Sequence, residues 1–176
     1  MDLRASIQLH RRIDALTDRH PLVRQICGQF VQGKRRYAGI LLDVLWDHAL
    51  ARNWDDYSKE SLHDFCYRIS AEVAADGEAY GYAGATAPPA ARLANVLLGY
   101  QRPASIDRAL AQIASRLRQP QPFTPLIHAW RSLVPDLEPV HPVLLRDILQ
   151  QLQVDWPAIL ADQSQEKGSS ASLNPA

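Results

Sequence analysis

Two aspartates one helical turn apart, Asp43 and Asp47, lie within a strongly apolar part of the sequence. The apolar run extends from residue 38 to residue 51, and nearly all of its remaining residues are hydrophobic. At about 100° per residue the two carboxylates project only about 40° apart, and like charges at this spacing repel each other. A helix that is apolar all round is buried, and a buried carboxylate without a partner destabilises the fold. We therefore expect a metal ion or cationic side chains beside this pair.

A second pair with the same spacing, His10 and Asp14, lies upstream. If two antiparallel helices face each other, the two pairs bring one imidazole and three carboxylates together. Such a mixed nitrogen and oxygen set suits manganese, magnesium or iron better than a metal that prefers thiolates. The four residues therefore predict a site for a divalent metal ion.

An ordinary structural explanation accounts for the same residues. Asp43 and Asp47 would then form buried ion pairs with nearby arginines, namely Arg11, Arg12, Arg35 or Arg36. His10 would be a core histidine with one hydrogen bond. His48 projects about 100° away from Asp47 around the helix, so we expect it to support the ligands from behind or to form a structural hydrogen bond.

Composition sets the outer limits. A chain of 176 residues with 47% hydrophobic content is long enough for one compact domain with its own core. The formal net charge is zero, which argues against a nucleic-acid binder. Cys27 and Cys66 show no metal-binding spacing and are typical of small buried residues in a reducing cytosol. No membrane span or secretion signal is evident, so we expect a soluble cytoplasmic protein that does not bind membranes.

Helical periodicity occurs along almost the whole chain, which predicts an all-α fold in a single compact helical domain. We expect this domain to cover residues 1–161 and residues 162–176 to form a disordered tail. Asp18 and Ser105 are predicted helix caps, residues 77–89 a loop, and residues 135–142 a proline-rich connection. The expected helices cover residues 3–16, 21–33, 34–52, 59–75, 90–100, 105–117, 125–133 and 142–152.

Two longer motifs carry a resemblance to a known family. Residues 9–21 (LHRRIDALTDRHP) and residues 36–48 (RYAGILLDVLWDH), followed by Trp54, resemble the acyl carrier protein phosphodiesterase family. Tyr100 and residues 109–116 (ALAQIASR) are similar to a later part of the same family. The resemblance extends over about residues 3–150.

The resemblance implies a helical fold distantly akin to the HD-type metal phosphohydrolases. It also implies a divalent metal, manganese first, with magnesium and iron as alternatives. The implied reaction is hydrolysis of the phosphodiester that joins 4′-phosphopantetheine to the serine of holo acyl carrier protein, which gives the apo carrier. In this interpretation Asp43 and Asp47 bind the metal from one helix, and His10 and Asp14 bind it from another. A further ligand position holds the attacking water.

Basic residues near these motifs would bind the carrier protein. Acyl carrier proteins are small, acidic and helical, so Lys34, Arg35 and Arg36 could attract one electrostatically. Arg11 and Arg12 could do the same, or one of them could pair with a phosphate oxygen through its guanidinium. A basic run at the start of a helix is, however, more often a solvated surface.

Two other functions stay open. The first is an HD-like metal phosphohydrolase that acts on a small phosphoester, and the second is a non-catalytic helical binding module whose aspartates are ion-paired. The chain also starts inside the first expected helix, without the upstream motif that the resemblance leads one to expect. We therefore expect little activity from these 176 residues and recovery with an N-terminal extension. The sequence leaves the oligomeric state undetermined.

Overall fold

The computed structural model describes residues 3–30, 35–75, 86 and 88–153, with the backbone alone for residues 3–7 and 35. Within these residues the secondary structure is entirely helical, which confirms the predicted all-α class. The helices are α1 (Leu3–Arg19), α2 (Pro21–Gly28), α3 (Arg35–Arg52), the 3-10 helix η1 (Trp54–Asp56), α4 (Leu62–Ala75), α6 (Ala90–Gly99), α7 (Pro103–Arg116), α8 (Thr124–Leu137) and α9 (His141–Gln151). The predicted tail and most of the predicted loop at 77–89 lie outside the described residues.

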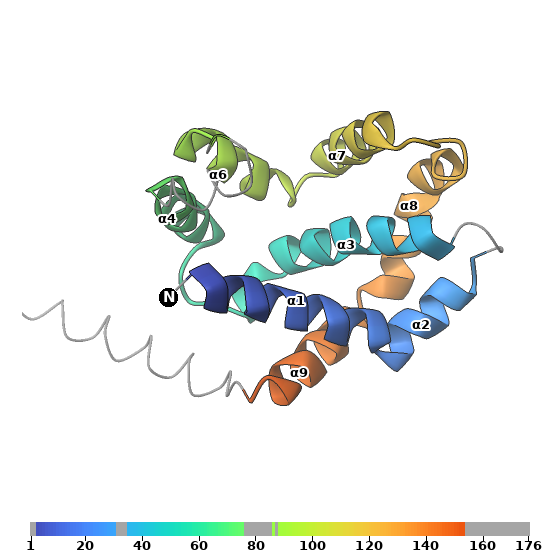
Figure 1. Ribbon diagram of the computed structural model, residues 1–176, viewed down its shortest axis with the longest axis horizontal. Coiled ribbons are helices and arrows are strands. Elements are labelled where there is room, and N and C mark those ends of the chain that lie inside the picture. Colours follow the sequence, from blue (N-terminus) through green and yellow to red (C-terminus); the bar gives the residue numbers. More distant parts are fainter. Residues whose placement is uncertain (1–2, 31–34, 76–85, 87, 154–176) are drawn as a thin grey trace, which may run out of the picture.

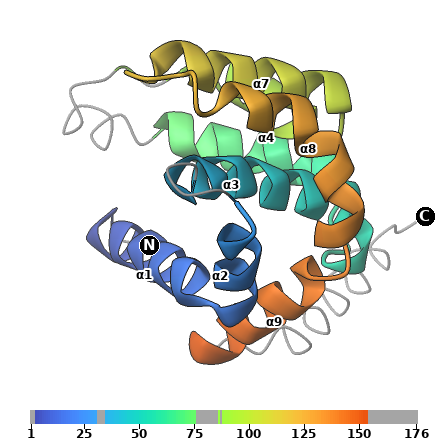
Figure 2. The same ribbon diagram turned by 90° about the vertical axis from the view of Figure 1, so that its right-hand side faces the viewer.

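Helix α3 occupies the middle of the molecule. Figures 1 and 2 show α1, α2 and α9 below it and α4, α6 and α7 above it, whereas α8 starts above α3 and runs down past it. Helix α3 contacts α2, α7, α8 and α9, whereas α4 packs mainly against α6. No helix among the described residues is long and apolar enough to cross a membrane.

The main core forms around α3 because this helix is apolar on almost every side. Its buried residues include Leu41, Leu42 and Leu45, which pack with Trp130 of α8 and with Phe123 directly before that helix. A helix with hydrophobic residues all round is stable only when other helices cover it. Helices α7, α8 and α9 therefore return over α3 and enclose it.

A smaller second core joins α4 and α6 to the end of α3. Its buried members are Ala51, Trp54, Leu62, Cys66 and Ala94. Tyr100, directly after α6, is half-buried and packs against both cores. The residue thus lies where the two parts of the molecule meet.

Helix α1 is one turn longer than the sequence indicates. It continues to Arg19, so Asp18 lies in its last turn and the prediction that Asp18 caps the next helix is wrong. The cap of α2 is His20, whose Nδ1 accepts a hydrogen bond from the backbone N–H of Leu22 at 3.3 Å. Because Nδ1 accepts, the proton is on Nε2, which lies 3.3 Å from a carboxylate oxygen of Asp147 in α9.

Two other predicted boundaries are also wrong. Helix α8 continues through Pro135 to Leu137, where a connection was expected. A proline removes only its own N–H bond and here lies close to the helix end, where few further bonds depend on it. Helix α7 begins at Pro103, which suits the first turn, so Ser105 is inside the helix and does not cap it.

Candidate active site

Asp43 and Asp47 lie on the one open stripe of α3. Both residues are exposed, as is Arg36 on the same stripe, whereas most neighbouring positions of the helix are buried. The expectation that the two aspartates are buried inside an apolar helix is therefore wrong. The helix is covered on nearly every side, and the uncovered stripe is the one that carries the carboxylates.

The surrounding protein nevertheless disfavours negative charge at this stripe. Partial burial and the charge of Asp43 raise the pKa of Asp47 to about 6. Burial also raises the pKa of Asp43, and the charges of Asp18 and Asp14 raise it further. Both causes act against the ionised form, which is the expected result when several carboxylates gather in a partly enclosed space.

The carboxylates that act on Asp43 come from α1. Asp14 and Asp18 are one turn apart on that helix, so α1 and α3 present acidic side chains to each other. His10 lies one further turn back, and its Nε2 is 3.6 Å from Asp14, with both side chains largely exposed. We refer to Asp14, Asp18, Asp43 and Asp47 as the acidic cluster.

Sequence reasoning assigned Asp18 a capping role and so missed it as a site residue. The signal was present, because His10, Asp14 and Asp18 repeat at intervals of four residues, the spacing of one helix face. Placing the end of the first helix at residue 16 interrupted this series. The extra turn of α1 brings Asp18 into range of Asp43.

Of the arginines that were expected beside the aspartates, Arg36 lies on the same stripe and lines the same cavity as Asp43. Among the described residues neither Asp43 nor Asp47 takes part in an ion pair. Arg12 donates to the backbone carbonyl of Gln151 in α9, and Arg11 is exposed. Lys34 and the side chain of Arg35 lie outside the described part of the chain.

The acidic cluster does not form a finished metal site. In the part of the chain that the structure describes, no three His, Cys, Asp or Glu side chains gather closely enough to hold a metal ion. The chemistry of His10, Asp14, Asp43 and Asp47 suits a hard divalent cation, but their arrangement does not fit one as it stands. Metal binding at these residues therefore stays a prediction.

His48 has a structural place behind the site. It is buried, and its Nδ1 donates a hydrogen bond to the backbone carbonyl of Tyr100. Its ring meets the edge of Trp130, with ring centres 5.6 Å apart. His48 thus connects α3 with the residue that follows α6. This agrees with the expectation that His48 forms a structural hydrogen bond.

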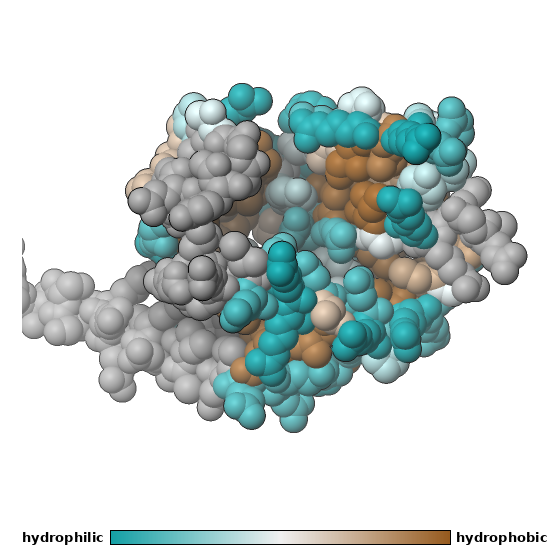
Figure 3. All heavy atoms as spheres, viewed as in Figure 1, coloured by the Kyte–Doolittle hydropathy of each residue, from teal (hydrophilic) through white to brown (hydrophobic). Residues whose placement is uncertain are grey.

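Two cavities flank the acidic cluster. A smaller one, of about 250 Å³, lies among α1, α2 and α3 and is lined by Asp18, Asp43, Arg24, Arg36 and the buried indole of Trp46, among others. The larger one, of about 810 Å³, lies between α6 and α7. Figure 3 shows the hollow on this side of the molecule, with apolar residues gathered over α7.

Tyr100 connects the larger cavity with the acidic cluster. It lines the cavity, and its pKa is raised by burial and by the charge of Asp47. Sequence reasoning used Tyr100 only as part of the resemblance and gave no role to the arginines of this cavity. Nothing in their spacing marks them, because α6 and α7 bring them together only in the folded chain.

Comparison with known proteins identifies the family. The family model for acyl carrier protein phosphodiesterase matches residues 1–144. Because this match covers well over half of the sequence, the chain belongs to that family.

Individual relatives match over shorter stretches. A Yersinia enterocolitica protein named acyl carrier protein phosphodiesterase is 47% identical over 70 residues, which are 39% of this chain and 36% of the relative. Proteins of the same name from Photorhabdus laumondii and Escherichia coli are 54% and 48% identical over 31% and 38% of this chain, and over 27% and 35% of their own length. The chain thus aligns with about a third of the length of these relatives. No solved structure matches it, so the HD-type architecture stays a prediction.

Proposed function

We propose that this protein hydrolyses the phosphodiester that joins 4′-phosphopantetheine to the serine of holo acyl carrier protein, which releases the apo carrier. The family match over residues 1–144 and the names of the curated relatives support this activity. The structural observation that carries it is the acidic cluster, in which Asp47 has a pKa of about 6 beside the larger cavity. Groups that titrate near neutral pH beside a cavity are typical of catalytic centres.

The reaction needs a proton to move from water to the serine oxygen. Water forms a bond to phosphorus, the bond between phosphorus and the serine oxygen breaks, and the serine leaves as its hydroxyl. A carboxylate with a pKa of about 6 accepts and releases a proton readily at neutral pH, which suits Asp47 to this transfer as long as its carboxylate is not bound to a metal ion. Burial and the charge of Asp43 maintain that pKa.

We further propose that a divalent metal, manganese first, binds at the acidic cluster, with His10 and Asp14 on one helix and Asp43 and Asp47 on the other. The support is the raised pKa of Asp43 and Asp47, because gathered carboxylates bind a cation in place of protons. Binding would require α1 and α3 to bring these groups closer together.

The metal proposal is tested by titrating Mn²⁺ into the chelator-treated protein and recording its paramagnetic resonance signal. Asp43→Asn should weaken binding by about tenfold or more, since it removes one charged ligand. Asp55→Asn, which changes an exposed aspartate of η1 away from the cluster, is the matched control. Equal Mn²⁺ binding by the wild type and Asp43→Asn would rule out this metal site.

The proposed partner is the folded holo carrier protein. The basic run at residues 34–36 and Arg11 are candidates for attracting an acidic partner, and of the run the structure describes the exposed side chain of Arg36. Arg12 is the weaker candidate, because its guanidinium already binds the end of α9.

One experiment separates this function from an HD-like hydrolase of small phosphoesters. The protein is offered holo carrier protein and, separately, bis(p-nitrophenyl) phosphate, each with Mn²⁺. We expect release of phosphopantetheine from the carrier and much slower cleavage of the small diester. Faster cleavage of the small diester would favour the alternative, and binding of the carrier without any cleavage would favour a non-catalytic binding module. Low turnover by the 176-residue chain stays a prediction, so the assay uses a large excess of enzyme.

A further inference from the structure

The larger cavity differs in character from the acidic cluster beside it. Its walls come from α6 and α7, which approach so closely that a Cβ at Gly99 would lie 3.3 Å from the Cβ of Ser105. The two helices are thus in close contact at this end, and the cavity lies between them. At about 810 Å³ the cavity has the size of a small-molecule site rather than of a groove for a protein helix.

The charged side chains that line this cavity are arginines. Arg92 comes from α6, Arg102 from the connection and Arg108 from α7, and no described residue of the lining is acidic. Within the described residues Arg92 and Arg108 form no ion pair, and Arg108 is positioned by a hydrogen bond to the Ser105 hydroxyl at 2.9 Å. Unpaired guanidiniums in a concave site favour an anionic ligand, phosphate above all.

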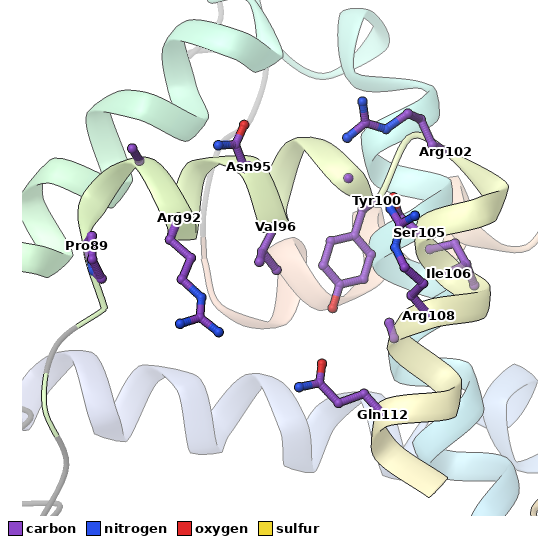
Figure 4. A pocket seen from close by; sticks show the side chains of 13 residues that line it. Pro89, Arg92, Asn95, Val96, Tyr100, Arg102, Ser105, Ile106, Arg108 and Gln112 are labelled. Carbon is purple, nitrogen blue, oxygen red and sulfur yellow. Dashed lines mark hydrogen bonds between the residues drawn. The ribbon is translucent and has the colours of Figure 1, made fainter. Parts of the chain in front are cut away.

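Figure 4 shows which of these side chains share one space. Arg92, Tyr100 and Gln112 point into the gap between the helices, Arg108 runs back along α7 beside Tyr100, and Arg102 points to the other side. The rest of the lining is apolar, with Val96, Ile106 and Ala109, or carries neutral amide groups, with Asn95 and Gln112. The cavity therefore offers Arg108 beside Tyr100, Arg92 further along α6, and neutral, partly apolar residues such as Val96 between them.

We infer that this cavity binds the phosphopantetheine arm of the substrate, with its phosphate between Arg92 and Arg108 and its amide and methyl groups along the neutral wall. This inference rests on the proposed function and names the residues that would bind the arm. Tyr100 places the phosphate end next to Asp47, whose charge reaches the tyrosine. The arginines also explain how an acidic cluster receives a negatively charged phosphodiester, because they offset the repulsion from the opposite wall.

The inference is tested by calorimetric titration of the full chain with 4′-phosphopantetheine and with pantetheine, which lacks the phosphate. Arg92→Gln and Arg108→Gln should each weaken binding of the phosphorylated arm by about tenfold, because each removes a charge-assisted hydrogen bond. Both residues are exposed, so the fold should tolerate the changes. Arg116→Gln, an exposed arginine of α7 outside the cavity lining, is the matched control and should bind like the wild type.

The phosphate dependence gives a second criterion. Pantetheine should bind more weakly than the phosphorylated arm, and its affinity should not change in Arg92→Gln or Arg108→Gln. Equal affinity of the wild type and both variants for 4′-phosphopantetheine, or no binding by the wild type at millimolar concentration, would overturn the inference.

Cleavage of holo carrier protein is recorded in parallel. Cleavage that survives both variants unchanged would reject the arm site and keep the proposed reaction, whereas variant-sensitive binding without cleavage would reject the reaction and keep the site.

Discussion

At the scale of single residues, the acidic cluster makes ionised carboxylates unfavourable in the folded protein. In the proposed reaction, the same environment favours proton transfer by Asp47. Asp47 is exposed to water, yet nearby protein and the charge of Asp43 make its ionised form unfavourable. The same environment gives the carboxylate a pKa of about 6, at which proton transfer near neutral pH is efficient. In the proposed function, the environment that suits Asp47 to proton transfer therefore also lowers the stability of the fold at neutral pH.

This trade-off predicts how stability depends on pH in the metal-free protein. The folded-state pKa of Asp47, about 6, is above its ordinary value of 3.8, so folding favours the protonated form. Its contribution to stability is present below about pH 3.8 and is lost as the pH rises through about 6. Asp47→Asn removes that loss and should stabilise the protein at pH 7.5 by about 1 kcal/mol, a value reduced for the exposure of the side chain.

Urea denaturation between pH 4 and pH 7.5, with a chelator present, measures this effect. The gain in the free energy of unfolding for Asp47→Asn should be small at pH 4 and reach its full size above pH 7. Asp55→Asn, an exposed aspartate of η1, should show no such trend. A gain for Asp47→Asn that is the same at every pH would show that its carboxylate is not perturbed in the folded protein.

At the scale of elements, α3 positions the site because everything else packs around it. Its buried sides fix its orientation, and His48 connects it to the carbonyl of Tyr100 at the start of the α6–α7 junction. One helix therefore sets the positions of Asp43 and Asp47 and, through His48, of the cavity wall. His48 is thus a structural contact between α3 and the residue that follows α6.

The replacement His48→Leu tests that connection. Leucine fills similar space but cannot donate, so the buried carbonyl of Tyr100 loses its partner and the free energy of unfolding should fall by about 1–3 kcal/mol. His128→Leu, the same change at an exposed position of α8, should have little effect. Thermal denaturation of both variants measures the difference. Equal melting temperatures for His48→Leu and the wild type would show that the hydrogen bond does not stabilise this junction.

The elements were largely predictable where local pattern and packing agree. The apolar run of α3 and the stripes of α4 and α6 identified these helices within a few residues. The errors occurred where tertiary contacts override local signals: His20 caps α2 while contacting Asp147 in α9, and α8 continues through Pro135. The acidic pairs could be predicted as site residues because they follow helical spacing. Asp18 was missed because the first helix was predicted to end at residue 16, before Asp18. Arg92 and Arg108 could not be found, since nothing in the sequence shows that α6 and α7 face one another.

At the scale of the whole molecule, a formal charge of zero conceals a separation of charge. Carboxylates gather between α1 and α3, and arginines line the cavity between α6 and α7. Figure 1 shows these two pairs of helices on opposite sides of the hollow seen in Figure 3. A phosphate-bearing arm could lie between the two walls while the carrier protein stays outside.

Association with the carrier should depend on the basic run at residues 34–36. Replacing Lys34, Arg35 and Arg36 together by glutamate should slow binding of acidic holo carrier protein by about tenfold at low salt and flatten its salt dependence, since charges at the rim act mainly on the association rate. Stopped-flow or surface-based kinetics at several salt concentrations measure this. An association rate that matches the wild type at low salt would exclude the run from the partner surface.

The most direct measurement of the central claim follows the conversion of holo to apo carrier protein by mass spectrometry, with Mn²⁺ and enzyme in excess over carrier. The wild-type enzyme should convert the carrier, even if slowly. The mass of the carrier should then fall by the mass of the phosphopantetheine group. Asp43→Asn should abolish the conversion, whereas Asp55→Asn should leave it unchanged. If the wild type leaves the holo carrier intact, or if Asp43→Asn converts it at the wild-type rate, the acidic cluster of α1 and α3 is not the catalytic centre of a carrier-protein phosphodiesterase.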